Sequence, residues 1–167
     1  MTSLREQLDD LRVRATTPDG AMTAELHGRS ALRLTFARGW YDRSTDDEVT
    51  RKLTALAGRL WVARTREYWR ILGAESGEYL TGEDRALGTR ADAYREGRNA
   101  LVAEGRSENG RVTIRVSGMR SWTVDVIPGT IHTCDEHEFA AMVEQAGAEL
   151  IRDQYRKIAR LKGEIYA

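Results

Sequence analysis

One short segment of the chain combines residue types that bind zinc or act as nucleophiles. His132, Cys134 and His137 lie within a few positions of one another, and imidazole nitrogens and thiolates are competent zinc ligands. Cys134 is the single cysteine, which excludes an intrachain disulfide and a zinc cluster built from several cysteines. A catalytic thiol would need an oriented base and an oxyanion partner, and the sequence supplies no clear candidate for either.

A structural role explains this segment better. Asp135 followed by Glu138 is typical of a helix N-terminus, with Asp135 as the N-cap. Cys134 then precedes the cap and Phe139 takes the fourth helical position, which are the two positions of a hydrophobic staple. The corresponding segment of an internal repeat, 42–47, contains neither histidine nor cysteine. We therefore expect no metal site.

Acidic residues also cluster at the start of another predicted helix. Asp46, Asp47 and Glu48 resemble a catalytic carboxylate group, but in a first helical turn they complement the helix dipole. The chain has no phosphate-binding loop, no dinucleotide glycine pattern and no zinc-protease helix. We expect no catalytic residue, no cofactor and no enzymatic activity.

Basic residues along the two long helical patterns suggest a different chemistry, the binding of phosphates. Two basic helix ends related by pseudosymmetry could straddle a DNA duplex and neutralise several phosphates. The alternative is that the basic residues complement the helix C-termini and remain solvated. The candidate DNA contacts are Arg51, Lys52, Arg59, Arg66 and Arg70 in the first helix, and Arg152, Arg156, Lys157, Arg160 and Lys162 in the second.

Aromatic residues accompany the first basic set. Trp61, Tyr68 and Trp69 are able to stack on bases or to plug a partner surface. Residues of these types more often pack in a core or an interface.

Composition limits the kind of DNA-binding protein that this chain can be. The 26 Lys and Arg residues balance 26 Asp and Glu residues, which excludes a uniformly basic protein that coats nucleic acid. With 41% apolar residues the chain can bury a core. It has no apolar run long enough for a membrane span and no signal-like leading segment, so we expect a cytoplasmic protein that does not bind membranes.

An internal repeat organises the chain. When the sequence is shifted by 90 residues, the segment 15–28 aligns without gaps on 105–118, and Pro-Asp-Gly20 lies over Glu-Asn-Gly110. This similarity predicts a first unit over 1–77, a linker over 78–88 and a second unit over 89–167.

Each unit shows the same order of predicted elements. A short helix and a glycine turn lead to two alternating strands, which carry Met22 and Leu26 in the first unit and Val112 and Val116 in the second. A long helix then closes each unit, with a capping box at Thr45 in the first unit.

The size of the units predicts how they pack. A unit of about 75 residues has a marginal core, and a lone hairpin needs cover for its apolar face. We therefore expect an α+β fold in which the antiparallel sheets of the two units pack together inside one molecule. A long helix closes each unit, and a pseudo-twofold axis relates them. The alternative is exchange of units between chains, as a homodimer or a domain-swapped dimer.

This arrangement resembles the YbaB/EbfC family of nucleoid-associated proteins, in the tandem form found in actinobacteria. The resemblance rests on the segments 17–29 and 107–118, each a turn followed by an alternating strand that ends at glycine. It implies α-β-β(-β)-α units that form dimers, bind DNA with little sequence preference and use no cofactor. It also implies, for the actinobacterial branch, proteins associated with type VII secretion.

Two hypotheses for function follow. The first is a nucleoid-associated protein that binds double-stranded DNA with little sequence preference through a built-in pseudo-dimer. The second is a protein-interaction or scaffold module, for example one associated with type VII secretion, which has lost DNA binding. The second predicts a protein partner held by exposed aromatics such as Trp40 or Trp69.

Overall fold

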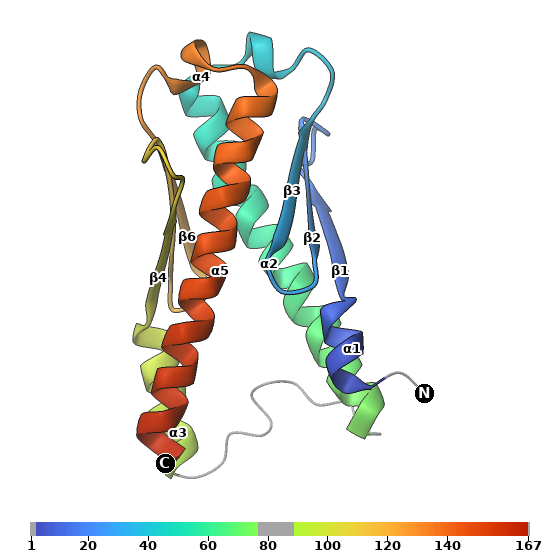
Figure 1. Cartoon of the computed structure of the whole chain (residues 1–167), viewed down its shortest axis with the longest axis vertical. Coiled ribbons are helices and arrows are strands. Elements are labelled where there is room, and N and C mark those ends of the chain that lie inside the picture. The colour runs from blue at the N-terminus through green and yellow to red at the C-terminus, as the bar shows by residue number, and fades with distance from the viewer. Residues whose placement is uncertain (1–2, 77–88, 167) are drawn as a thin grey trace.

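A computed structural model describes residues 3–76 and 89–166, in which two groups of helices and strands follow one another (Figure 1). The expected linker, 78–88, lies outside the described residues. The N-terminal half contains α1 (Leu4–Asp9), β1 (Arg12–Thr16), β2 (Met22–His27), β3 (Ala31–Phe36), the 3-10 helix η1 (Tyr41–Arg43) and α2 (Asp46–Ser76). The C-terminal half contains α3 (Thr89–Ala100), β4 (Val102–Arg106), β5 (Val112–Ser117), β6 (Ser121–Val126), α4 (Thr130–Thr133) and α5 (Glu136–Tyr166).

The strands form two separate antiparallel sheets, with orders β1-β2-β3 and β4-β5-β6. Met22 pairs with Phe36 in one sheet, and Val112 pairs with Val126 in the other. The alternating residues of β2 and β5 are buried on one face, as the sequence pattern predicted. The fold is therefore α+β.

The first strand of each sheet was only an optional element of the expected unit. Val13 in β1 and Ala103 in β4 are buried, so these strands also contribute to the core. Gly105 in β4 lies so close to α5 that an added Cβ would be 1.9 Å from the carbonyl oxygen of Ala146. A glycine at this position therefore lets the strand and the helix pack closely.

Predicted caps begin both long helices. The hydroxyl of Thr45 accepts a hydrogen bond from the backbone N–H of Glu48 at 3.2 Å. Asp135 accepts from the N–H of Glu138 at 2.8 Å. Each long helix then continues for 31 residues.

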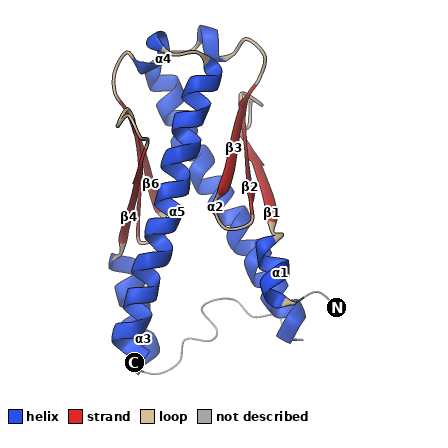
Figure 2. Cartoon of the chain, in the orientation of Figure 1, coloured by secondary structure: helices blue, strands red, loops and turns tan. Residues whose placement is uncertain are grey.

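The expectation that the two sheets pack on each other is wrong. Both figures show α2 and α5 crossing between the sheets, which lie on the outer sides (Figures 1 and 2). α5 packs on β4 and β5 of its own half and on β3 of the other, while α2 packs on β1, β2 and β6. Each long helix therefore covers parts of both sheets.

Glycines on the long helices explain how one helix can pack against both sheets. An added Cβ at Gly147 of α5 would lie 2.4 Å from Leu32 of β3, and one at Gly58 of α2 would lie 3.7 Å from Trp122 of β6. A larger side chain at Gly147 would displace Leu32, so the absence of a side chain lets the opposite sheet approach.

Contacts between the halves are specific as well as apolar. The hydroxyl of Tyr41 lies 3.0 Å from the carbonyl oxygen of Ile131 and 2.9 Å from that of Cys134. Asp46, at the start of α2, accepts from the N–H of Gly129 at 2.9 Å. Glu144 of α5 accepts from the N–H of Leu34, in an edge strand of the other half, at 2.9 Å. The two halves share one hydrophobic core within this single chain.

Candidate nucleic-acid interface

The candidate cations of α2 differ in what surrounds them. Arg51, Arg59 and Arg66 are exposed, and no carboxylate within the described residues forms an ion pair with any of them. Arg59 makes one hydrogen bond, to the carbonyl oxygen of Thr16 at 3.3 Å. These three guanidinium groups therefore keep most of their donors available for an anion.

The other two candidates on α2 have acidic partners. Lys52 contacts Asp19 at 2.5 Å, and this hydrogen bond holds the pKa of the Asp19 carboxyl well below its usual range. Arg70 forms an ion pair with Glu67, and the bond lowers the pKa of Glu67. Binding of phosphate to these two cations would compete with an existing partner.

Three candidates on α5 are engaged in the same way. Arg152 pairs with Glu149 at 3.0 Å. Arg156 and Lys157 both pair with Asp153, at 3.4 Å and 2.9 Å. These local partners neutralise much of the positive charge that the sequence places on this helix.

The last two candidates lie nearer the C-terminus. Arg160 and Lys162 are exposed, and among the residues that the structure describes neither forms an ion pair with a carboxylate. Lys162 lies 5.9 Å from the centre of the Tyr94 ring, in a cation–π arrangement. Because Figure 1 shows the C-terminal parts of α2 and α5 diverging, the two basic ends lie on separate arms.

Asp153 holds its part of α5 to the neighbouring strand. Its carboxylate accepts from the N–H of Glu104 in β4 at 2.9 Å, and it also pairs with Lys157. Burial alone would raise the pKa of Asp153, but these hydrogen bonds outweigh burial and lower it. The ionised carboxylate therefore stabilises the folded state.

Replacement of Asp153 by asparagine is expected to remove a pH-dependent part of the stability. Because the folded pKa lies below the unfolded value of about 3.9, the stabilisation is complete above about pH 5 and is lost as the pH falls through the folded pKa. Asp153→Asn should cost about 1 kcal/mol in urea unfolding at pH 7, and much less near pH 3. Glu149→Gln, at a more exposed pair, is the control and should change little. An equal loss at both pH values would show that the carboxylate charge is not responsible.

Arg64 is a basic residue of α2 that the candidate set did not include, and its side chain is buried. Its guanidinium lies 5.3 Å from the ring centre of Trp61, 6.0 Å from that of Tyr68 and 5.8 Å from that of Tyr155 on α5. It also donates to the hydroxyl of Tyr155. Arg64 therefore contacts the other long helix through Tyr155, rather than presenting a charge to solvent.

The aromatic candidates belong mainly to the packing of the protein. Trp61 lies 5.9 Å from Trp122 of the opposite sheet, measured between ring centres. Trp69 packs edge-on against Tyr68 at 5.4 Å, and Trp40 stacks on Phe36 at 6.0 Å. All these tryptophans are half-buried, so the structure places core and interface contacts ahead of a free stacking platform.

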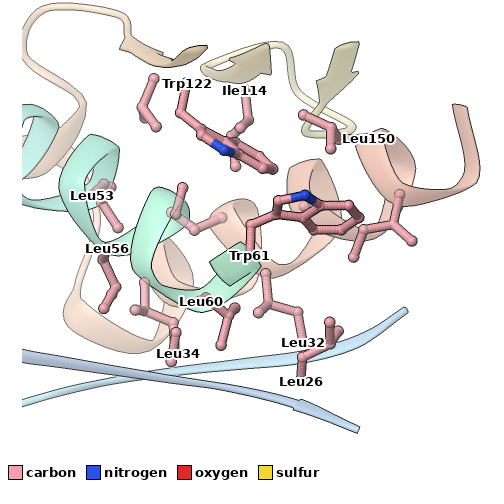
Figure 3. Close-up of a pocket in the computed structure, with 16 residues that line it drawn as sticks. Leu26, Leu32, Leu34, Leu53, Leu56, Leu60, Trp61, Ile114, Trp122 and Leu150 are labelled. Atoms are coloured by element: carbon pink, nitrogen blue, oxygen red, sulfur yellow. The ribbon is translucent and has the colours of Figure 1, made fainter. Parts of the chain in front are cut away.

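An apolar cavity lies where the long helices cross. Its volume is about 70 Å³, and Trp61 and Trp122 lie on its wall together with leucines from α2, α5 and the first sheet (Figure 3). The residues that line it carry no titratable group. A lining of this kind offers no acid, base or metal ligand.

The segment with His132, Cys134 and His137 does not converge on a common point. The thiol of Cys134 donates to the carbonyl oxygen of Thr130 at 2.9 Å, and both histidines are exposed. Within residues 3–76 and 89–166, no group of three His, Cys, Asp or Glu side chains is arranged to hold a metal ion. The nearby hydroxyl of Tyr41 is buried, which raises its pKa.

None of the described helices is both long and apolar enough to cross a membrane. Comparisons of the chain with family models, curated proteins and solved structures give no match.

Proposed function

We propose that this chain is a nucleoid-associated protein that binds double-stranded DNA with little sequence preference. In this proposal its two halves are tandem copies of one unit, related by a pseudo-twofold axis, and act as a built-in pseudo-dimer. Support for the repeat comes from the element positions: β2 begins at Met22 and β5 at Val112, and α2 begins at Asp46 and α5 at Glu136.

One observation carries the DNA proposal: the long helices bear a set of exposed Arg and Lys residues that have no carboxylate partner among the described residues. The set consists of Arg51, Arg59, Arg66, Arg160 and Lys162. Contacts of this kind neutralise phosphates regardless of base sequence. The resemblance of both halves to YbaB/EbfC proteins supports the same function.

A mobility-shift titration with a mixed-sequence duplex tests this function. We expect binding at low salt, with an observed association constant that falls steeply as salt rises. If about four phosphates are neutralised, the slope of log K against log salt should be about −3.6. Lack of a shift at low salt would contradict DNA binding.

A second candidate function, a protein-interaction or scaffold module, has one observation in its favour. Val62 on α2 is 49% exposed and is therefore an apolar side chain available to a partner. Trp40 and Trp69, which this hypothesis expected at the interface, are half-buried in contacts within the chain. A stable protein partner whose binding is insensitive to salt, together with no shift of DNA, would favour this function.

A further inference from the structure

The outward faces of the two long helices differ in charge, although they occupy corresponding positions in the repeat. Over α5 lies a groove of about 950 Å³, which residues of β4 and of the start of β3 also line. Over α2 lies a hollow of about 370 Å³. Arg59 in the hollow corresponds to Glu149 in the groove. The two helices therefore carry opposite charges at this equivalent position of the repeat.

The groove over α5 is acidic, and both of the arginines that line it are paired. Its charged lining residues are Glu104, Glu108, Glu144, Glu149, Arg106 and Arg152. Both arginines face glutamate partners within the groove, at 3.2 Å and 3.0 Å. A surface with excess carboxylate repels the phosphates of a duplex.

The hollow over α2 has the opposite character. It is lined by Ala55, Gly58, Arg59, Val62, Ala63 and Arg66, and thus by two arginines and no acidic residue. The small side chains between the arginines leave room for a phosphate backbone to approach the helix. Neither arginine has a carboxylate partner within the described part of the chain.

The cations of this face are also spaced along the helix. Arg51, at the N-terminal side of the hollow, is exposed like Arg59 and Arg66. With a rise of 1.5 Å per residue, the helix from Arg51 to Arg66 extends about 22 Å. That length corresponds to about six base pairs at 3.4 Å each, so the three side chains can reach several phosphates of one duplex.

We propose that the protein binds duplex DNA on one side only, through the outward face of α2 that carries Arg51, Arg59 and Arg66. Arg160 and Lys162, on the separate arm of α5, then take no part in binding. This inference rests on the proposed function and specifies its surface. A symmetric homodimer presents the same residues on both of its equivalent faces. Two units fused in one chain are free to differ, and here one face keeps its unpaired cations while the corresponding face is acidic.

A matched pair of double charge reversals tests this proposal. Arg59→Glu with Arg66→Glu changes the α2 face, and Arg152→Glu with Arg156→Glu changes the α5 face by the same net charge. In a low-salt mobility-shift assay we expect the α2 variant to lose at least tenfold in affinity and the α5 variant to lose less than threefold. The salt slope should fall by about 2 in the α2 variant, since two phosphate contacts are removed.

Two checks separate this result from a loss of folding. All four side chains are exposed, so both variants should still unfold in one cooperative thermal transition. The α5 variant should be slightly less stable, because it breaks the pairs of Arg152 with Glu149 and of Arg156 with Asp153. Arg59→Gln with Arg66→Gln, which removes charge without reversing it, should show a smaller loss in the same direction.

The possible failures are distinguishable. If the unmodified protein binds DNA and both double reversals lose equally, or only the α5 variant loses, one-sided binding is wrong and DNA binding stands. If the unmodified protein gives no shift at low salt, both proposals fail. A salt-insensitive protein partner lost only in the α2 variant would instead assign this face to protein binding.

Discussion

Replacement of Gly105 by alanine is expected to lower the free energy of unfolding by about 3 kcal/mol or more. The added Cβ would lie 1.9 Å from the carbonyl oxygen of Ala146 and 2.3 Å from the backbone nitrogen of Leu150. Both atoms belong to the backbone of α5, so no rotamer change can relieve the overlap. Either β4 or α5 must move, and that movement disturbs the core of the C-terminal half.

Urea unfolding, followed by circular dichroism, measures this effect. Gly163→Ala, in α5, is a control because an added Cβ there meets nothing within 4 Å. This variant should leave stability unchanged or slightly higher. The corresponding strand position of the N-terminal half is Ala15, which shows that β1 accommodates a Cβ at this place. If Gly105→Ala is as stable as the unmodified protein, β4 does not pack as closely on α5 as described.

The sequence predicted the strands that have strong alternation and the helices that have clear caps. β2, β3, β5 and β6 show the period of two, and Thr45 and Asp135 cap the long helices as expected. β1 and β4 were harder to predict because their residues show little apolar alternation. In particular, glycine has a low strand propensity, so Gly105 argued against a strand. Its close contact with the backbone of α5 explains why a glycine stands there.

The sequence could not predict what covers the sheets. Alternation shows that one face of a sheet is buried, but it does not show which element buries it. The answer depends on Leu32 and Trp122, which pack on the helix of the opposite half at Gly147 and Gly58. A glycine within a helix is a weak signal by itself, because it also occurs for other reasons.

The candidate interface was predicted as a set of basic residues, but not as two surfaces of different charge. The carboxylates that engage α5, Glu149 and Asp153, are visible in the sequence three or four residues before their partners, and this spacing could have indicated the ion pairs. The burial of Arg64 could not be found this way, because Tyr155, one of its three aromatic neighbours, lies on the other long helix.

The crossing of the helices also explains why the two halves should unfold together. Each long helix covers strands of both sheets, and the backbone N–H of Leu34 in one half bonds to Glu144 of the other. Neither half keeps its core when the other unfolds. We therefore expect one cooperative transition rather than two.

Phe139 connects the halves near the start of α5. Its side chain is fully buried, and its ring centre lies 6.2 Å from that of Phe36 and 5.7 Å from that of Tyr41. Both partners belong to the N-terminal half. Removal of this ring leaves a cavity between the halves, and the bonds of the Tyr41 hydroxyl to the carbonyl oxygens of Ile131 and Cys134 resist movement of Tyr41 into it.

Phe139→Ala is therefore expected to lower the free energy of unfolding by about 3 to 5 kcal/mol. Phe139→Leu should cost less because it keeps most of the apolar contact, and Val49→Ala, at the corresponding position of α2, should also cost less because a smaller side chain is removed. In all three variants the fluorescence of tryptophans in both halves should change at one urea concentration. Two separate transitions would show that the halves are stable independently of each other. A loss below about 1 kcal/mol in Phe139→Ala would show that this ring does not hold the shared core together.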